Sequence, residues 1–215
     1  MKKKERDIIF AAFFLALFVL WTAAVCFIDV RPIGPLGSSV GFSNFNGFVH
    51  SLTGVHMRLY TLTDILSIVP LGFAGGFGIL GLIQWIKRGK ISKVDSSILV
   101  LGIFYAAIIV TFIFFEFFPV NYRPVLIEGT LEPSYPSSTT LLVMCVISSA
   151  AMQLDSRIKN VFFRRIINFL LYAFTAFMVF SRLFSGVHWI SDIIGGVLLS
   201  FGLLLLYRFF CRHFS

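Results

Sequence analysis

Six long apolar stretches constrain the fold of this chain more than any other feature. They cover residues 8–28, 65–86, 97–118, 138–154, 166–182 and 190–210. A helix needs about 20 apolar residues to cross the hydrocarbon core of a bilayer, and inside lipid the backbone must be paired within helices or closed barrels. We therefore predict an all-α integral membrane protein, a six-transmembrane-helix bundle that forms a single membrane-embedded domain over residues 1–215.

The low content of charged residues agrees with this prediction. Only 13% of the residues are charged, about half the share found in a typical soluble domain. The basic N-terminus resembles the start of a signal peptide, but the first apolar stretch is long and no small-x-small cleavage site leads into a soluble mature domain. We expect this stretch to remain as a membrane anchor.

Lysine and arginine are distributed unevenly between the two sides of the predicted bundle. One side holds four basic clusters, which are Lys2, Lys3, Lys4 and Arg6; Lys87, Arg88, Lys90 and Lys93; Arg157, Lys159, Arg164 and Arg165; and Arg208 and Arg212. The other side keeps Arg31, Arg58, Arg123 and Arg182. Because cytoplasmic loops carry the basic excess, we predict that the N- and C-termini are both cytoplasmic. The net charge of +8 then reflects topology, and we expect no nucleic-acid partner.

The predicted outer loop over residues 29–64 contains a second kind of apolar pattern. Its large apolar residues are Phe42, Phe45, Phe48, Val49, Leu52 and Val55. A spacing of three to four residues predicts an amphipathic helix in the membrane interface. His50 and His56 have no acidic residue nearby in the sequence, so we interpret them as polar residues at headgroup level.

Small residues are interpreted as packing positions. The glycines between residues 72 and 81 predict close contact of the second helix with its neighbours. Cys26, Cys145 and Cys211 have neither metal-ligand nor redox spacing, so we interpret them as small apolar residues.

The most informative polar motif lies at the junction of the last two apolar stretches. Ser181-Arg182 is followed by His188 and then by Asp192. Charged groups inside a membrane are costly and usually functional. His188 and Asp192 are four residues apart, so their side chains can meet on one helix turn. The motif therefore supplies a nucleophile, its orienting carboxylate and a cation that can bind an anion.

Two further polar clusters are predicted on the same side of the membrane as this motif. They are Arg123-Pro124 and Pro136-Ser137-Ser138-Thr139. Arginine forms forked hydrogen bonds to phosphate oxygens, and a helix N-terminus with Ser or Thr offers further donors. The three clusters together predict a phosphate site on the extracytoplasmic side of the cell membrane.

At these residues the chain resembles the type-2 phosphatidic acid phosphatase superfamily, which shares its fold with bacterial acid phosphatases and vanadium haloperoxidases. The third family motif, Ser-Arg, five residues, His, three residues, Asp, is matched over residues 181–192. The first motif, Lys, six residues, Arg-Pro, is matched at Arg123-Pro124, but Glu116 replaces the lysine. The second motif, Pro-Ser-Gly-His, is matched at Pro136-Ser137 and then departs from it.

The resemblance implies a lipid phosphatase that needs no metal and no cofactor. Its third-motif histidine, here His188, would attack phosphorus and form a phosphohistidine, with Asp192 as the orienting group. The implied phosphate-binding residues are Arg123, Arg182, Ser137, Ser138 and Thr139. The implied substrate is a lipid phosphate or diphosphate, of the phosphatidic acid or polyprenyl diphosphate type.

The two departures from the motifs carry their own expectations. Thr139 stands where the family has the histidine that protonates the leaving group, and a missing general acid costs about a hundred- to ten-thousand-fold in rate. A diphosphate loses a stable phosphate anion and needs this proton less, so we expect a bias towards diphosphates. Glu116, Glu128 or Glu132 could instead supply the proton if burial raises its pKa. Glu116 could pair with Arg123 or Arg182, or it could point away. If it faces the site, it would weaken phosphate binding.

Three alternatives remain open on the sequence. The chain could be a catalytically weak or inactive family member that binds lipid phosphates. It could be a transporter, although no paired broken helices support that reading. Arg182 could also be a helix-end arginine that reaches the headgroups beside an interfacial His-Trp pair, which explains each residue but not their joint spacing.

Overall fold

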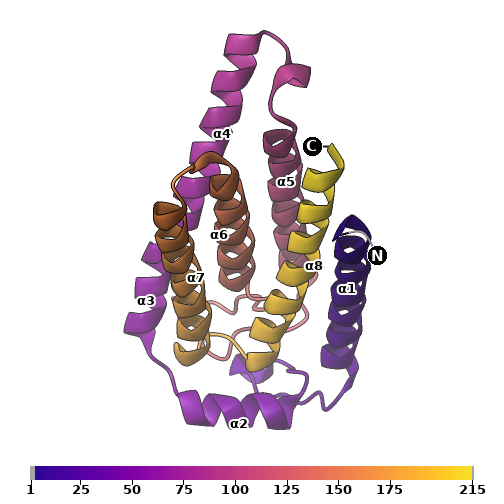
Figure 1. Cartoon of the computed structure of the whole chain (residues 1–215). Helices are drawn as coiled ribbons and strands as arrows, with labels where there is room; N and C mark the ends of the chain where they lie inside the picture. Colours follow the sequence, from indigo (N-terminus) through magenta and orange to yellow (C-terminus); the bar gives the residue numbers. More distant parts are fainter. Residues whose placement is uncertain (1–2, 215) are drawn as a thin grey trace.

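The structure is a computed structural model that describes residues 3–214, and within this range it is entirely helical apart from loops and isolated β-bridges (Figure 1). The long and medium helices are α1 (Lys3–Phe27), α2 (Ser43–Thr53), α3 (Met57–Leu66), α4 (Ile68–Arg88), α5 (Ser96–Phe117), α6 (Ser138–Arg157), α7 (Val161–Phe184) and α8 (Ile190–Phe214). Two short 3₁₀ turns, η1 (Pro35–Gly37) and η2 (Ile91–Lys93), lie in the connections.

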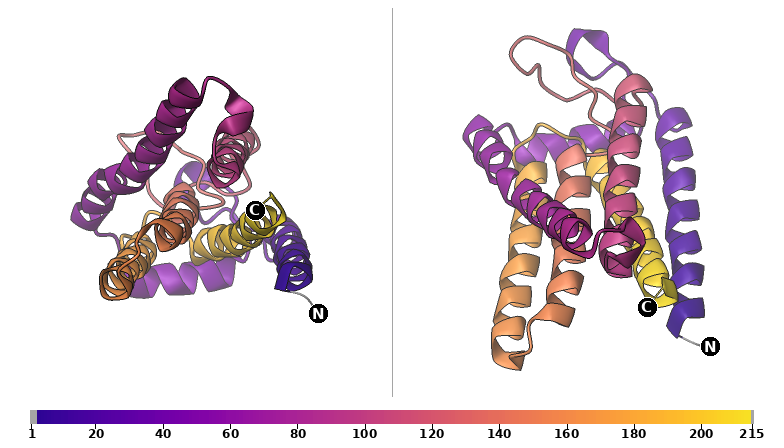
Figure 2. Two further views of the ribbon diagram at one scale, coloured as in Figure 1. Left: turned by 45° about the horizontal axis from the view of Figure 1, so that its top comes forward. Right: turned by 90° about the horizontal axis from the view of Figure 1, so that it is seen from above.

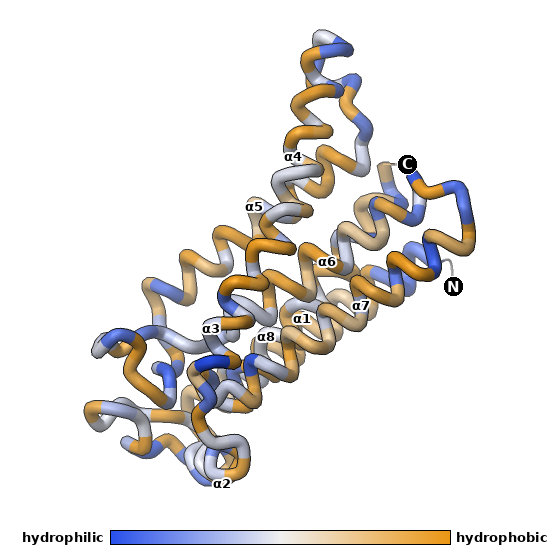
Figure 3. The backbone as a smooth tube through the Cα atoms, turned by 90° about the vertical axis from the view of Figure 1, so that its left-hand side faces the viewer, coloured by the Kyte–Doolittle hydropathy of each residue, from blue (hydrophilic) through white to orange (hydrophobic). Residues whose placement is uncertain are grey.

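Six helical segments in the described range are long and apolar enough to cross a membrane. They are Lys3–Phe27, Met57–Arg88, Ser96–Phe117, Ser138–Arg157, Val161–Phe184 and Ile190–Phe214. The predicted all-α bundle with six transmembrane helices is therefore confirmed. Figure 3 shows the same division, because hydrophobic residues follow the helices and hydrophilic residues gather towards the ends of the bundle.

Three spans begin well before their predicted starts. The second span begins at Met57, not at 65, because α3 leads into α4 through Ser67, which has helical backbone angles. The first span begins at Lys3, not at 8, and the fifth begins at Val161, not at 166. Charged residues such as Asp7, Asp64 and Arg164 lie in these added parts, so hydropathy alone misses helix that the backbone forms.

Helix α6 occupies the middle of the bundle, where it contacts α4, α5, α7 and α8 (Figures 1 and 2). It is also the most buried of the six spans. Helix α2 lies across the end of the bundle at which α7 joins α8 (Figure 1). This position confirms that the loop over residues 29–64 contains a helix, and it brings α2 against the start of α8.

The expected close packing at the glycines of the second span is largely wrong. A Cβ atom placed on Gly72, Gly75, Gly76 or Gly78 would have no heavy atom of a neighbouring element within 4 Å among the described residues. Only at Gly81 does another helix come close, where Ile98 would lie 3.0 Å away. These glycines therefore leave open space along α4 and do not draw helices together.

A buried carboxylate joins the two ends of the chain. Asp7 in α1 is fully buried, and its Oδ1 lies 2.5 Å from Nη2 of Arg208 in α8. Its Oδ2 pairs with Arg212, one turn further along α8. Helices α1 and α8 pack side by side over their length (Figure 1). The two arginines that the sequence indicated as topological charges thus also hold α1 in place.

We predict that Asp7→Asn lowers the stability of the bundle by about 1–3 kcal/mol. Breaking a buried ion pair strands its partner charge at a cost of about 3–5 kcal/mol, and both arginines here keep more than a third of their side chain exposed, 36% and 38%, which reduces that cost. Thermal unfolding in detergent micelles measures the change. Glu128→Gln, at an exposed loop position, is the control; equal unfolding temperatures for the two variants would contradict the prediction.

Candidate active site

The three polar clusters identified in the sequence meet at one end of the bundle. Arg123 lies in the loop between α5 and α6, Ser137 is the N-cap of α6, and His188 lies in the short connection between α7 and α8. The backbone N–H of Ser137 donates to the carbonyl oxygen of Asp192 at 3.1 Å, which fixes the start of α6 against the start of α8. The side chains of Arg123, Arg182 and His188 are all buried.

His188 is placed between a carboxylate and a guanidinium group. Its Nδ1 lies 3.7 Å from Oδ2 of Asp192, slightly beyond hydrogen-bond distance, and its Nε2 lies 3.4 Å from Nη1 of Arg123. A proton on Nδ1 would face the carboxylate, and the lone pair on Nε2 would then face the guanidinium. In this tautomer Nε2 carries no proton, so its lone pair is the one that could attack an electrophile.

Asp192 is fully buried and is held by three donors. Its Oδ1 accepts from Nδ2 of Asn121 at 3.0 Å and from the Ser191 hydroxyl at 3.4 Å, and its Oδ2 accepts from the backbone N–H of Trp189 at 3.0 Å. Asn46 of α2 supports this arrangement, because its amide donates to the Ser191 hydroxyl at 2.9 Å and accepts from the Ser191 N–H at 3.1 Å. Sequence reasoning missed both asparagines. Asn121 was marked only by its place two residues before Arg123, and Asn46 only by its place in the predicted interfacial helix.

The two arginines share one aromatic ring. Their Cζ atoms lie 4.9 Å (Arg182) and 5.9 Å (Arg123) from the centroid of the Tyr60 ring. Tyr60 belongs to α3, which the sequence did not indicate as part of the site. The ring lies between two like charges and attracts both, since aromatic faces carry negative potential.

Each arginine also contacts a carboxylate. Nη2 of Arg182 lies 3.5 Å from Oδ1 of Asp64, and Nε of Arg123 lies 2.9 Å from Oε2 of Glu132. Within residues 3–214, Nε and Nη1 of Arg182 have no hydrogen-bond partner although they are buried. Because a buried unpaired donor is costly, these two N–H groups are available for an anion.

The second motif contributes one residue that caps α6, Ser137, and two residues whose backbone N–H groups can bind an anion, Ser138 and Thr139. The Ser137 hydroxyl accepts hydrogen bonds from Thr140, from its N–H at 3.4 Å and its hydroxyl at 3.0 Å, and so caps α6. Thr139 accepts a hydrogen bond from Nη2 of Arg182 at 2.5 Å. The N–H groups of Ser138 and Thr139 lie in the first turn of α6, where a helix has no internal acceptor for them, so they offer donors to an anion.

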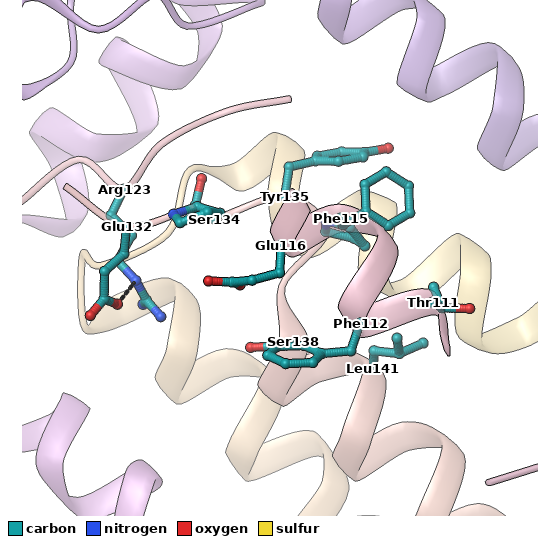
Figure 4. A pocket seen from close by; sticks show the side chains of 12 residues that line it. Thr111, Phe112, Phe115, Glu116, Arg123, Glu132, Ser134, Tyr135, Ser138 and Leu141 are labelled. Carbon is teal, nitrogen blue, oxygen red and sulfur yellow. Dashed lines mark ion pairs between the residues drawn. The ribbon is translucent and has the colours of Figure 1, made fainter. Parts of the chain in front are cut away.

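A cavity of about 240 Å³ adjoins Arg123, and Glu116 lines it. Figure 4 shows the Glu116 carboxylate between Ser134 and Ser138, pointing towards the ion pair of Arg123 and Glu132. Glu116 thus faces the cavity beside Arg123 and does not point away, but among the described residues it forms no ion pair with Arg123 or Arg182. Glu128 does not line this cavity.

The connection that carries His188 is fastened to α2 and to the turn after it. The backbone N–H of His56 donates to the carbonyl oxygen of Ser185 at 2.9 Å, and Nε2 of His50 lies 3.2 Å from the carbonyl oxygen of Gly186. Gly186 has a φ of 69°, and a Cβ there would collide with the carbonyl of Gly54. Only glycine fits this close approach. The His50 ring therefore has a defined contact with this connection, whereas His56 contributes only its backbone N–H and its side chain is exposed, as expected of a headgroup-level residue.

The environment of His188 keeps its imidazole neutral. Burial lowers its pKa from 6.5 to about 4; the charges of Arg123 and Arg182 act in the same direction, and Asp192 opposes them. A neutral imidazole is the form that can attack an electrophile.

Comparison with known proteins identifies the family. The model of the PAP2 superfamily matches residues 76–213, and the chain belongs to this superfamily. The structure is similar to the "first transmembrane PAP2 type phosphatidylglycerolphosphate phosphatase from Bacillus subtilis", with a TM-score of 0.62, 17% sequence identity, and coverage of 95% of this chain and 97% of that chain. At this identity the likeness establishes the fold. No curated protein sequence matches significantly.

We predict that the imidazole of His188 titrates near pH 4. Proton loss is complete well below neutrality because the folded-state pKa is lowered. The neutral imidazole is therefore the main form at pH 5, and it is lost as the pH falls through about 4. Spectra of ¹³C-histidine-labelled protein measure this, with the His188 signal assigned as the one absent from His188→Ala. A midpoint between pH 6 and 7 would contradict the prediction.

Proposed function

We propose that this chain is a membrane lipid phosphatase that acts through a phosphohistidine at His188. The observation that supports this most is the placement of Nε2 of His188 beside Arg123, with the unpaired buried N–H groups of Arg182 close by on the neighbouring helix end. Membership of a phosphatase superfamily supports the same conclusion.

In the proposed reaction, the lone pair on Nε2 forms a bond to phosphorus while the bond from phosphorus to the leaving oxygen breaks. Asp192 holds the Nδ1 proton and stabilises the positive charge that the imidazole gains. Arg123, Arg182 and the first-turn N–H groups of Ser138 and Thr139 bind the phosphoryl oxygens, whose charge grows in the transition state. Water then attacks the phosphohistidine and releases inorganic phosphate. Ser137 acts by capping α6, and no metal or cofactor takes part.

A lipid substrate is favoured by the surroundings of the polar site. A second cavity of about 370 Å³ has four polar lining residues, Asp64, Ser67, Ser138 and Thr139, and its other lining side chains are apolar, among them Leu71, Ile108, Phe112 and Leu142. An acyl or prenyl chain fits such a lining, with its phosphate at the polar residues. We place the reaction on the extracytoplasmic side of the cell membrane, on the basis of the four basic clusters, and we treat residues 1–215 as one domain.

The substituted second motif favours leaving groups that need little protonation. Thr139 cannot replace the proton that a histidine supplies, and its hydroxyl is engaged by Arg182. A lipid diphosphate, such as a polyprenyl diphosphate, expels a phosphate that is already a stable anion. We therefore propose a bias towards diphosphates over simple alkyl monoesters.

A second candidate function is phosphate binding without turnover. The ion pairs of Arg123 with Glu132 and of Arg182 with Asp64 favour it, because carboxylates that already contact the arginines compete with phosphate. Both carboxylates are substantially exposed, 38% and 63%, so solvent weakens this competition.

The first test is phosphate release by the purified protein from lipid monophosphates and diphosphates. We expect release by the wild-type chain and its loss, by at least a thousandfold, in His188→Ala, because the nucleophile is removed. Transfer of a ³²P label to the protein should disappear in the same variant. Phosphate release that persists in His188→Ala would refute the mechanism, and binding without release by the wild type would favour the second candidate.

The second test restores the missing general acid. Thr139→His should raise hydrolysis of alkyl monophosphates by at least tenfold, within the range of about 10²–10⁴ that a general acid supplies, with a smaller change for diphosphates. The ratio of kcat/KM values for the two substrate classes measures this. Thr139→Val, which removes only the hydroxyl contact with Arg182, is the matched control. No gain on monoesters would count against the missing-acid explanation.

A further inference from the structure

We propose that the cavity beside Arg123 binds an ammonium group of the substrate, so that this chain prefers lipid phosphates carrying a primary amine close to the phosphate ester. The inference rests on the proposed function, which places the phosphate between Arg123 and His188. It adds a role in substrate selection for the neighbouring cavity and for Glu116. It concerns the position at which the family motif has a cation and this chain has an anion.

The charged side chains that line the cavity favour the binding of a cation. Three charged side chains line it, Glu116, Glu132 and Arg123. The Arg123 guanidinium is paired with Glu132 at 2.9 Å, so these two charges largely cancel. Within residues 3–214, Glu116 forms no hydrogen bond or ion pair. The cavity therefore presents one uncompensated negative charge next to a site that binds phosphate, an arrangement that repels a second anion and attracts a cation.

The aromatic and hydroxyl side chains that line the rest of the cavity also suit an ammonium group. Phe112, Phe115 and Tyr135 contribute aromatic rings to the cavity (Figure 4). Aromatic faces together with a carboxylate are the usual surroundings of ammonium ligands, because the ring quadrupole attracts a cation. The Ser134 hydroxyl also lines the cavity; Ser134 is only 3% exposed, and its oxygen has no partner among the described residues. It can accept a hydrogen bond from an ammonium group.

The cavity lies next to the proposed phosphate position. Arg123 both lines the cavity and contacts Nε2 of His188 at 3.4 Å. A phosphate held by Arg123 thus has its substituent at the mouth of the cavity. The volume of about 240 Å³ accommodates an ammonium group on a two- or three-carbon arm, while the hydrocarbon tail of the same lipid extends elsewhere along the bundle.

An ammonium next to the ester also compensates for the absent histidine at position 139. When Nε2 of His188 bonds to phosphorus, the electron pair of the broken P–O bond moves to the leaving oxygen. An ammonium two carbons away gives that oxygen a proton and becomes an amine, which regains a proton from water. Glu116 holds the ammonium in place before the step. One substrate class thus accounts for both departures from the family motifs.

The test compares two lipids that differ in one group. A long-chain 2-aminoalkyl phosphate and its 2-hydroxyalkyl isostere of equal chain length are presented in the same detergent micelles. Binding is measured as ligand-dependent thermal stabilisation of the His188→Ala variant, which does not consume the lipid, and turnover is measured as kcat/KM of the active chain. Glu116→Gln and Glu116→Lys remove and reverse the charge, and Glu128→Gln is the matched control outside the cavity.

We expect the amino lipid to be preferred at least tenfold in both measurements. Glu116→Gln should abolish this preference, Glu116→Lys should reverse it in favour of the hydroxy lipid, and Glu128→Gln should leave it unchanged. Equal behaviour of the two lipids with the wild-type side chain at position 116 overturns the proposal, as does a preference that survives in Glu116→Gln. Amine-dependent stabilisation without phosphate release supports the ammonium site and refutes the hydrolytic function, so the two failures are distinguishable.

Discussion

The buried carboxylate of Asp192 determines how this end of the bundle is built. A buried carboxyl group needs hydrogen-bond partners, and Asp192 obtains three. Asn121 reaches it from the loop after α5, and the Trp189 N–H and the Ser191 hydroxyl reach it from the start of α8. Asn46 then ties Ser191 to α2. His188, the proposed nucleophile, lies beside this network.

Two buried guanidinium groups near one imidazole form the electrostatic counterpart of this network. Burial lowers the pKa of His188, and the charges of Arg123 and Arg182 act in the same direction, so the groups that could bind an anion also keep the imidazole neutral. Three carboxylates lie near these arginines. Glu132 and Asp64 contact them directly, whereas Glu116 lines the cavity beside Arg123, which is why we assign charge balance to the first two and propose substrate selection for Glu116.

The sequence allowed prediction of the elements whose signal is local. Long apolar runs predicted the six spans, and the fixed spacing of Arg182, His188 and Asp192 predicted their meeting, because one turn of helix and one short loop decide it. Asn46, Asn121 and Tyr60 were missed because their partners are far away in the sequence. The partner is 145 positions away for Asn46 and 71 positions away for Asn121, and Tyr60 contacts Arg123 and Arg182. Hydropathy also hid α3, where polar side chains that serve the site interrupt the apolar pattern.

Helix α2 has one face packed against the connection that carries His188 and one face exposed at the surface of the bundle. Its inward residues Asn46 and His50 hold the connection before α8, while Phe45, Phe48 and Leu52 are 46%, 62% and 70% exposed on its outer surface. Such side chains find their natural solvent among acyl chains and headgroups. We therefore expect the membrane interface to cover the outer surface of α2, so that a bilayer, or a detergent in its place, supports the connection that carries His188.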